Sequence, residues 1–301
     1  MTTPAPTPPQ VRMRSLVRLA WFGLAVIGGL AGLAEIASQV TYGGFTDISA
    51  YYQAAARLNS GAPLYVASAN PEAANYYQYP PLLAIAFRPL ALLPFHLAVV
   101  IWEAAMFAAF ALIIWRLGLR FSTAVAIGVL GLPIAWALAT GQAQMLVTLL
   151  LVIGTPGSVA LAANLKVVPA LVALYWVGRR DWIAVARFAG WLMVLALVQL
   201  VLAPAGTLAY PSFLLHNRAG NVHNFSPLAW SPLAWAVLVG AGAIAVLVLA
   251  KRRSGWAAAV VLSTLATPRL LSYVLCTLLA TLQQPGARDS IVRARERQSG
   301  A

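Results

Sequence analysis

The chain has 301 residues, of which 61% are hydrophobic and only 9% are charged. Soluble domains carry about 25% charged residues, so this composition excludes an ordinary soluble protein and indicates a polytopic integral membrane protein. The net charge of +13 does not indicate nucleic-acid binding, because the basic residues cluster at the ends of apolar runs, which is the positive-inside pattern. The single cysteine, Cys276, excludes an intrachain disulfide and a cysteine-based metal site.

The N-terminal region predicts a tail followed by a first membrane helix. Residues 1–15 are rich in Pro and Thr and are expected to form a disordered cytoplasmic tail, held inside by nearby arginines. The apolar segment 16–37 is long enough to cross a hydrocarbon core of about 30 Å. A cleaved signal peptide is the alternative, but its apolar run would be shorter, about 7 to 15 residues. We therefore expect an uncleaved helix that opens a transmembrane domain over 16–282.

The polar segment 38–81 is predicted to be the first external loop, and it contains Asp47, one of only seven acidic residues. Asp47 heads a pattern that predicts a short amphipathic helix on the membrane surface, ending at Asn59-Ser60-Gly61. The apolar face of this helix comprises Ile48, Tyr51, Ala55 and Leu58. Asp47 has two interpretations: a reactive carboxylate, or a residue that caps the helix and suits its positive end.

Apolar runs with basic ends predict the remaining membrane segments. Clear spans are expected at 95–115, 121–139, 182–202 and 228–250. Interrupted segments are expected at 82–94, 145–178 and 256–282. The expected architecture is all-α and polytopic, with about eight to ten membrane segments, and it includes a second external loop at 203–227. A basic C-terminal tail follows at 283–301, and the side of the membrane on which it lies stays open.

Lys166 and Arg269 are charged residues in apolar surroundings, and each adjoins a proline that breaks a helix. A cation at the centre of a membrane helix costs about 2.5 to 3.5 kcal/mol on insertion, so each requires a partner or a wet cavity. An anionic ligand such as a lipid phosphate would stabilise both. The alternatives are pairing with Glu35 or Glu103, or extension of the side chain to the surface.

Histidines and tyrosines gather in the two external loops. His216 and His223 do not form a metal site by spacing alone, and the sequence predicts no metal or cofactor. The tyrosines of the first loop suit interfacial anchoring, and a minority could stack on sugars. They are Tyr51, Tyr52, Tyr76, Tyr77 and Tyr79.

Several short sequence motifs occur along the chain in a characteristic order. The first loop contains Thr46-Asp47 with Tyr51-Tyr52, Leu58-Asn59-Ser60-Gly61-Ala62-Pro63-Leu64-Tyr65, Tyr79-Pro80-Pro81-Leu82 and the segment 89–94. Later motifs are Gly141-Gln142, Leu165-Lys166, and Thr267-Pro268-Arg269 with Tyr273. Together they resemble glycosyltransferase family 87, of the GT-C superfamily of polytopic glycosyltransferases.

The resemblance implies a bacterial cell-envelope enzyme similar to mannosyltransferases. It would move a hexose from a polyprenyl-phosphate donor to a lipid or glycan acceptor at the external face of the cell membrane, and mannose is the expected hexose. It implies inversion at the anomeric carbon, with Asp47 as general base and no cofactor beyond the donor. Implied donor-phosphate residues are Arg269, Lys166, His223 and Arg88, and candidate sugar or acceptor contacts are Tyr51, Tyr52, Tyr79, Gln142 and His216.

Members of this family are usually longer, so the chain resembles a shortened member. Two alternatives remain: a transporter or lipid-binding membrane protein, or a non-catalytic relative of the transferase.

Overall fold

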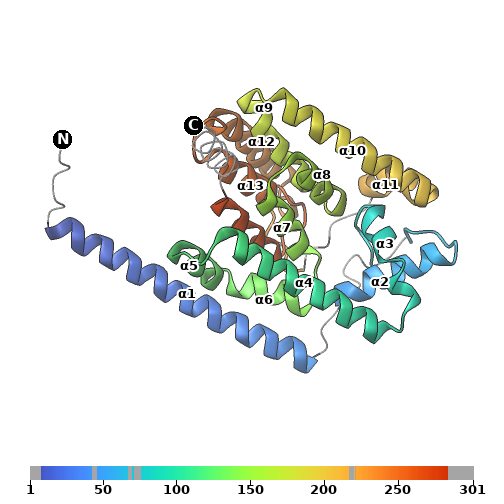
Figure 1. Cartoon of the computed structure of the whole chain (residues 1–301), viewed down its shortest axis with the longest axis horizontal. Coiled ribbons are helices and arrows are strands. Elements are labelled where there is room, and N and C mark those ends of the chain that lie inside the picture. Colours follow the sequence, from blue (N-terminus) through green and yellow to red (C-terminus); the bar gives the residue numbers. More distant parts are fainter. Residues whose placement is uncertain are drawn as a thin grey trace, which may run out of the picture.

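The computed structural model describes residues 8–42, 46–66, 70, 76–216, 220 and 222–283. These residues form helices and no strands (Figure 1). The α-helices are α1 (Pro8–Tyr42), α2 (Thr46–Asn59), α3 (Pro81–Phe87), α4 (Phe95–Leu117), α5 (Phe121–Val129), α6 (Gly131–Ala139), α7 (Gln144–Ile153), α8 (Pro156–Leu165), α9 (Leu174–Arg179), α10 (Trp182–Leu202), α11 (Pro204–His216), α12 (Pro232–Leu249) and α13 (Gly255–Leu265). The 3-10 helices are η1 (Leu90–Leu92), η2 (Val168–Ala173), η3 (Pro227–Ala229) and η4 (Ser272–Leu282).

Four helices of the described chain are long and apolar enough to cross a membrane: α1 over Ser15–Gln39, α4, α10 and α12. The bent pair α5 and α6 makes a fifth if it counts as one span. Their most apolar windows are only 6% to 33% buried, so most of their side chains face outward, as lipid-facing helices do. The polytopic all-α class is therefore confirmed. The expected eight to ten segments stay a prediction, because the other apolar helices are too short to count by this criterion.

Helix α1 begins at Pro8, within the segment 1–15 that composition assigned to a disordered tail. Proline is tolerated in the first turn of a helix, where its missing N–H needs no partner. Further along, α1 packs closely on α5 and α6 (Figure 1). A Cβ on Gly32 would lie 2.6 Å from the carbonyl oxygen of Gly131, so only glycine permits this backbone approach.

The expected span over 121–139 is not one continuous helix, because α5 and α6 meet at a bend of 64°, which makes the pair either a broken span or a re-entrant loop. The break falls at Leu130, between Val129 and Gly131. Pro133 lies four residues after Val129, and its ring would clash with that carbonyl in a continuous helix. After the bend, α6 packs against α1 and η4.

The first loop follows the sequence pattern. Helix α2 spans Thr46–Asn59, and the side chains of Ile48, Tyr51 and Ala55 on its apolar face are fully buried. Arg88-Pro89 separates α3 from η1, as the broken apolar pattern predicted. Helix α2 packs against both of these short elements.

The second external loop differs from the prediction, because α11 occupies the first half of 203–227. After His216, the described residues 220 and 222–226 are non-helical, and residues 217–219 and 221 lie outside the described chain. Asn224 ties this part to the break between α13 and η4. Its Oδ1 accepts from the backbone N–H of Leu270 (2.9 Å), and its Nδ2 donates to the Pro268 carbonyl (3.2 Å).

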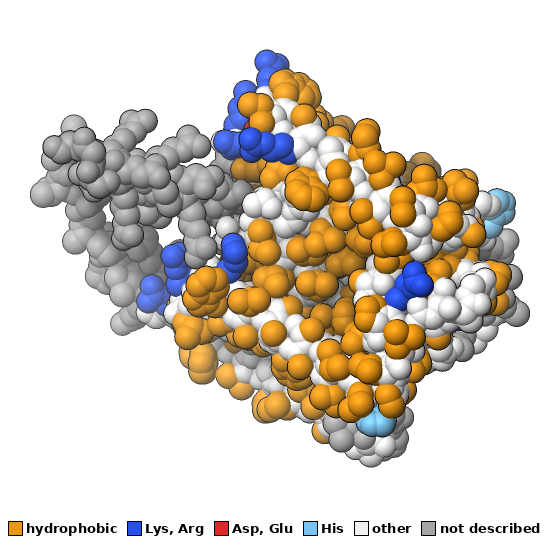
Figure 2. Space-filling view, turned by 45° about the vertical axis from the view of Figure 1, so that its right-hand side comes forward, with side chains coloured by type: hydrophobic (Ala, Val, Ile, Leu, Met, Phe, Trp, Pro, Cys, Tyr) orange, Lys and Arg blue, Asp and Glu red, His pale blue; other side chains and the backbone are white. Residues whose placement is uncertain are grey.

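One face of the molecule is covered mainly by hydrophobic side chains (Figure 2). Lys and Arg side chains lie mostly toward the left of this view, with one separate patch at the right. This separation of charge from apolar surface is what a bilayer requires of a protein embedded in it.

A candidate active site at the start of helix α2

Four chain breaks meet at one place: the N-terminus of α2, the turn between α6 and α7, the break between α8 and η2, and the break between α13 and η4. Gly141 forms the turn with a φ of +69°, and a Cβ there would collide with the side chain of Ile48 on α2. Trp102 on α4 holds the turn by donating its indole N–H to the Gly141 carbonyl (2.7 Å). The glycine therefore allows this turn to lie directly against the start of α2.

Asp47 is the second residue of α2, and its side chain is half-buried. Burial raises the pKa of Asp47 to about 6, because a desolvated carboxylate is disfavoured. The charge of Lys166, a hydrogen bond from Thr140, the charge of Arg269 and a hydrogen bond from Gln142 oppose this shift in decreasing order. The carboxylate is thus mostly ionised at neutral pH and is a stronger base than an ordinary aspartate.

Gln142 is completely buried, and its side-chain amide is occupied by protein groups. Its Oε1 accepts from the Tyr51 hydroxyl (3.1 Å) and from Lys166 Nζ (3.3 Å). Its Nε2 donates to the Tyr79 hydroxyl (3.1 Å). Gln142 was predicted from the sequence as a sugar or acceptor contact. In the structure, its amide holds Tyr51, Tyr79 and Lys166 in place near Asp47.

Lys166 lies at the break after α8, in a cage of amides and aromatic rings. Its Nζ donates to Gln144 Oε1 (2.6 Å) and lies 4.8 Å from the ring centroid of Tyr273 and 5.3 Å from that of Tyr79. Gln144 in turn donates to Thr277 Oγ1 (2.6 Å). The hydrogen-bond and ring partners of the ammonium are neutral, and the opposing charge that acts on it is that of Asp47.

The sequence prediction missed the roles of Gln144 and Thr277. The only local signal was the polar stretch 140–144 between apolar helices, which did not reveal the partner on η4. The alternative pairing of Lys166 with a membrane carboxylate is not found among the described residues. Glu35 accepts from Gln39 on the same helix (2.8 Å), and Glu103 on α4 has a buried Oε1 without a hydrogen-bond partner.

Arg269 and His223 lie on the side of the cluster formed by the second loop. Arg269 is half-buried and close enough for its charge to lower the pKa of Asp47. His223 has a positive φ of 54°, and its ring centroid lies 6.4 Å from that of Trp136. Trp136 also contacts Tyr273 (6.0 Å between ring centroids), so His223 borders the cluster without entering its hydrogen-bond network.

Three predicted site residues lie elsewhere. Arg88 donates from Nε to Asn59 Oδ1 (2.8 Å) at the opposite end of α2. Tyr52 donates its hydroxyl to the Leu93 carbonyl (2.7 Å), and His216 is exposed at the end of α11. No group of three or more His, Cys, Asp or Glu side chains that could hold a metal occurs in the described ranges.

Comparison with known proteins places the sequence in a family. A family model of glycosyltransferase family 87 matches residues 77–280, about two thirds of the chain. The chain belongs to glycosyltransferase family 87. The matched region of this family 87 protein contains Gln142, Lys166 and Arg269 but begins after Asp47, so the place of Asp47 in the site is argued from geometry.

One curated relative is the polyprenol-phosphate-mannose-dependent alpha-(1-2)-phosphatidylinositol pentamannoside mannosyltransferase of Mycolicibacterium smegmatis. It is 28% identical over 205 residues, which cover 62% of this chain and 49% of the relative. The chain therefore spans about half the length of this relative. No solved structure matches the chain.

Proposed function

We propose that this family 87 protein is a membrane glycosyltransferase that moves mannose from a polyprenyl-phosphate donor to a glycolipid acceptor, with inversion. The observation that carries the proposal is the convergence of one carboxylate, Asp47, with two cations, Lys166 and Arg269, from distant parts of the chain. A base and a pair of positive charges are what transfer from a sugar phosphate requires.

Asp47 acts as the general base. Its carboxylate removes the proton of the acceptor hydroxyl while that oxygen forms a bond to the anomeric carbon. The bond between the anomeric carbon and the phosphate oxygen breaks on the opposite face, and polyprenyl phosphate leaves with the electron pair. A pKa of about 6 suits this step, because the base is ionised at neutral pH and accepts a proton more readily than a solvated aspartate.

Lys166 and Arg269 neutralise the phosphate as its negative charge develops. The amide and aromatic cage around Lys166 holds the ammonium in place before the reaction, which is how fixed charges lower a barrier. His223 is a third donor at the edge of this site. Arg88 has no part in it, since it pairs with Asn59 at the far end of α2.

The acceptor is assigned to the class named for the relative, a mannosylated phosphatidylinositol. Both polar loops border the cluster, the first through α2 and the second through the Asn224 contacts to the α13–η4 break. The positive-inside rule assigns these loops to the external face, with the N-terminus in the cytoplasm. We therefore assign the reaction to the external side of the membrane.

The test is transfer of radiolabelled mannose from polyprenyl-phosphate-mannose to phosphatidylinositol mannosides, in membranes that contain the parent chain or Asp47→Asn. Loss of a general base lowers turnover by about 100- to 10,000-fold, so Asp47→Asn should be inactive while its expression is unchanged.

The matched control is Glu35→Gln, which also neutralises a carboxylate but lies on α1, paired with Gln39. This variant should keep transfer within about twofold of the parent. Equal activity in Asp47→Asn and the parent removes the assigned base. Absence of transfer from this and related polyprenyl-phosphate sugars in the parent favours a non-catalytic relative.

A further inference from the structure

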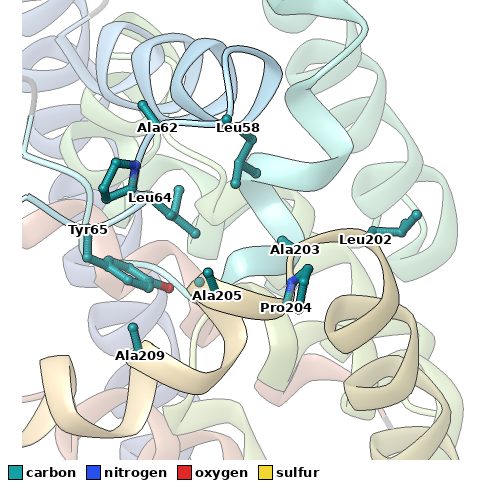
Figure 3. A pocket seen from close by; sticks show the side chains of 12 residues that line it. Leu58, Ala62, Leu64, Tyr65, Leu202, Ala203, Pro204, Ala205 and Ala209 are labelled. Atoms are coloured by element: carbon teal, nitrogen blue, oxygen red, sulfur yellow. The ribbon is translucent and has the colours of Figure 1, made fainter.

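An apolar groove lies at the end of α2 away from Asp47 (Figure 3). It has a volume of ≈ 510 Å³ and lies between the segment 58–65, which follows from the last turn of α2, and the α10–α11 junction at 202–209. Leu58 and Leu64 line one side, and Ala205 and Ala209, one helical turn apart on α11, line the other (Figure 3). No charged side chain lines this groove.

The groove opens at the end of a membrane helix. Helix α10 is one of the candidate spans, and its last residue, Leu202, is 47% exposed. Gly206 lets α11 approach the other wall, because a Cβ there would lie only 3.0 Å from Leu64. The surroundings of the groove are therefore hydrocarbon and its boundary with water, and a lipid chain is the molecule available to fill it.

A cation stands beside the groove. Arg57, in the last turn of α2, donates from Nε to the carbonyl of Leu64, a groove residue (3.2 Å). This bond fixes the guanidinium next to the apolar walls, and among the described residues Arg57 has no carboxylate partner. Arg57 is half-buried, and burial lowers its pKa, the direction expected for a desolvated cation. A phosphate at this position would offset that desolvation.

We propose that this groove binds the acceptor lipid, with one hydrocarbon chain between α2 and α11 and the lipid phosphate at Arg57. The inference rests on the proposed function, since it assigns one of the two substrates. Arg57 lies ten residues beyond Asp47 on one helix, which corresponds to about 15 Å. The donor phosphate must be adjacent to the reacting carbon, so a lipid held at Arg57 is not the donor.

The same distance defines the acceptor. Its reacting hydroxyl lies near Asp47 while its phosphate lies about 15 Å away, so several sugars must connect the two. Phosphatidylinositol itself is too short to serve, whereas an extended phosphatidylinositol mannoside can span the helix. The site therefore selects acceptors by the length of the headgroup.

The kinetic test uses a substitution that fills the groove with a larger side chain. Ala209→Phe places a ring in the space of the lipid chain, while Leu208→Phe adds a ring at a neighbouring position that is 73% exposed. With Ala209→Phe we expect the KM for the acceptor to rise about tenfold or more, equivalent to about 1.4 kcal/mol, with kcat and the donor KM unchanged. Leu208→Phe should match the parent. A rise in the donor KM instead would assign the groove to the donor and overturn the inference.

The charge is tested at Arg57 in the same assay. Arg57→Gln should raise the acceptor KM, and Arg57→Lys, which keeps the charge, should raise it less. Equal effects of the two substitutions would contradict a phosphate at this position.

A binding test that needs no turnover uses Asp47→Asn in phosphatidylcholine vesicles containing phosphatidylinositol with a photoreactive acyl chain. Crosslinks are expected in the segments 58–65 and 202–209, weaker with an equivalent phosphatidylcholine probe, and lost when Ala209→Phe is added. Equal labelling by both probes, or labelling that Ala209→Phe does not reduce, overturns the inference. If this labelling is found but the parent chain shows no mannose transfer, the lipid site is upheld and the proposed function is overturned.

Discussion

The two ends of helix α2 have opposite environments. At its start, Asp47 lies among polar and charged groups from three other chain breaks. At its end, Arg57 lies beside a groove lined by apolar side chains. One rigid helix thus separates the site proposed for chemistry from the site proposed for lipid binding by about 15 Å.

The helix dipole favours this arrangement. An acid in the first turn and a base in the last turn are each stabilised by about 0.3 to 1 kcal/mol at exposed sites. The pKa of Asp47 is nevertheless raised and that of Arg57 is lowered, so desolvation outweighs the dipole at both ends. A substrate group that binds to either charge would therefore compensate for the hydration that the charge lost on burial.

Among the residues around Asp47, Lys166 is expected to give the largest effect, in the substitution Lys166→Gln. Loss of one fixed charge at a developing anion costs about 100- to 1,000-fold in kcat. Lys166 also lowers the pKa of Asp47, so its removal raises that pKa above about 6. Because the ionised form is the active base, the acid limb of the pH profile should move to higher pH. The measurement is kcat for mannose transfer as a function of pH.

The control for this substitution is Lys251→Gln, which changes the only other lysine of the chain, an exposed residue just after α12. It should leave both kcat and the acid limb unchanged. A Lys166→Gln enzyme with a normal acid limb would show that Lys166 does not act on Asp47.

A smaller loss is expected for Gln142→Leu. This substitution removes the acceptor shared by Tyr51 and Lys166 and the donor to Tyr79. A shift of the reacting groups by about 1 Å costs about 100-fold in rate. Gln142 also lowers the pKa of Asp47, so the acid limb should again move to higher pH.

This pH readout separates positioning from simple loss of structure. Gln39→Leu, which breaks a hydrogen bond to Glu35 on α1, is the matched control and should leave the acid limb in place. If Gln142→Leu lowers activity only in proportion to the amount of folded protein, with the limb unmoved, its role is structural.

Local patterns predicted the elements that depend on neighbouring residues. The amphipathic repeat after Asp47 predicted α2, and the prolines beside Arg88 and Lys166 predicted two helix breaks. The bend between α5 and α6 was missed, although Pro133 is a local signal, because the apolar run continues through it. Helix α11 was missed because the polar residues of the second loop were taken to represent the whole segment.

The site was predictable where charge alone marks a residue. Asp47, Lys166 and Arg269 each stand out in apolar sequence, and the structure brings them together. The positions of the other candidates depend on partners far away in the chain. Arg88 was grouped with the phosphate residues because the sequence does not reveal its bond to Asn59, 29 residues away. The bond between Gln144 and Thr277 joins residues 133 positions apart, beyond any local pattern.

The smallest expected effect tests whether the two ends of α2 act independently. Asn59→Ala removes the Nδ2 bond to the Arg88 carbonyl (3.0 Å) and the acceptor of Arg88 Nε (2.8 Å). Two lost hydrogen bonds should lower the free energy of unfolding by about 1 to 3 kcal/mol, measured by thermal unfolding in detergent. At saturating acceptor, kcat and the acid limb should equal those of the parent, in contrast to Gln142→Leu. A shifted acid limb in Asn59→Ala would mean that a change at the lipid end moves Asp47, and the helix would then couple acceptor binding to the strength of the base.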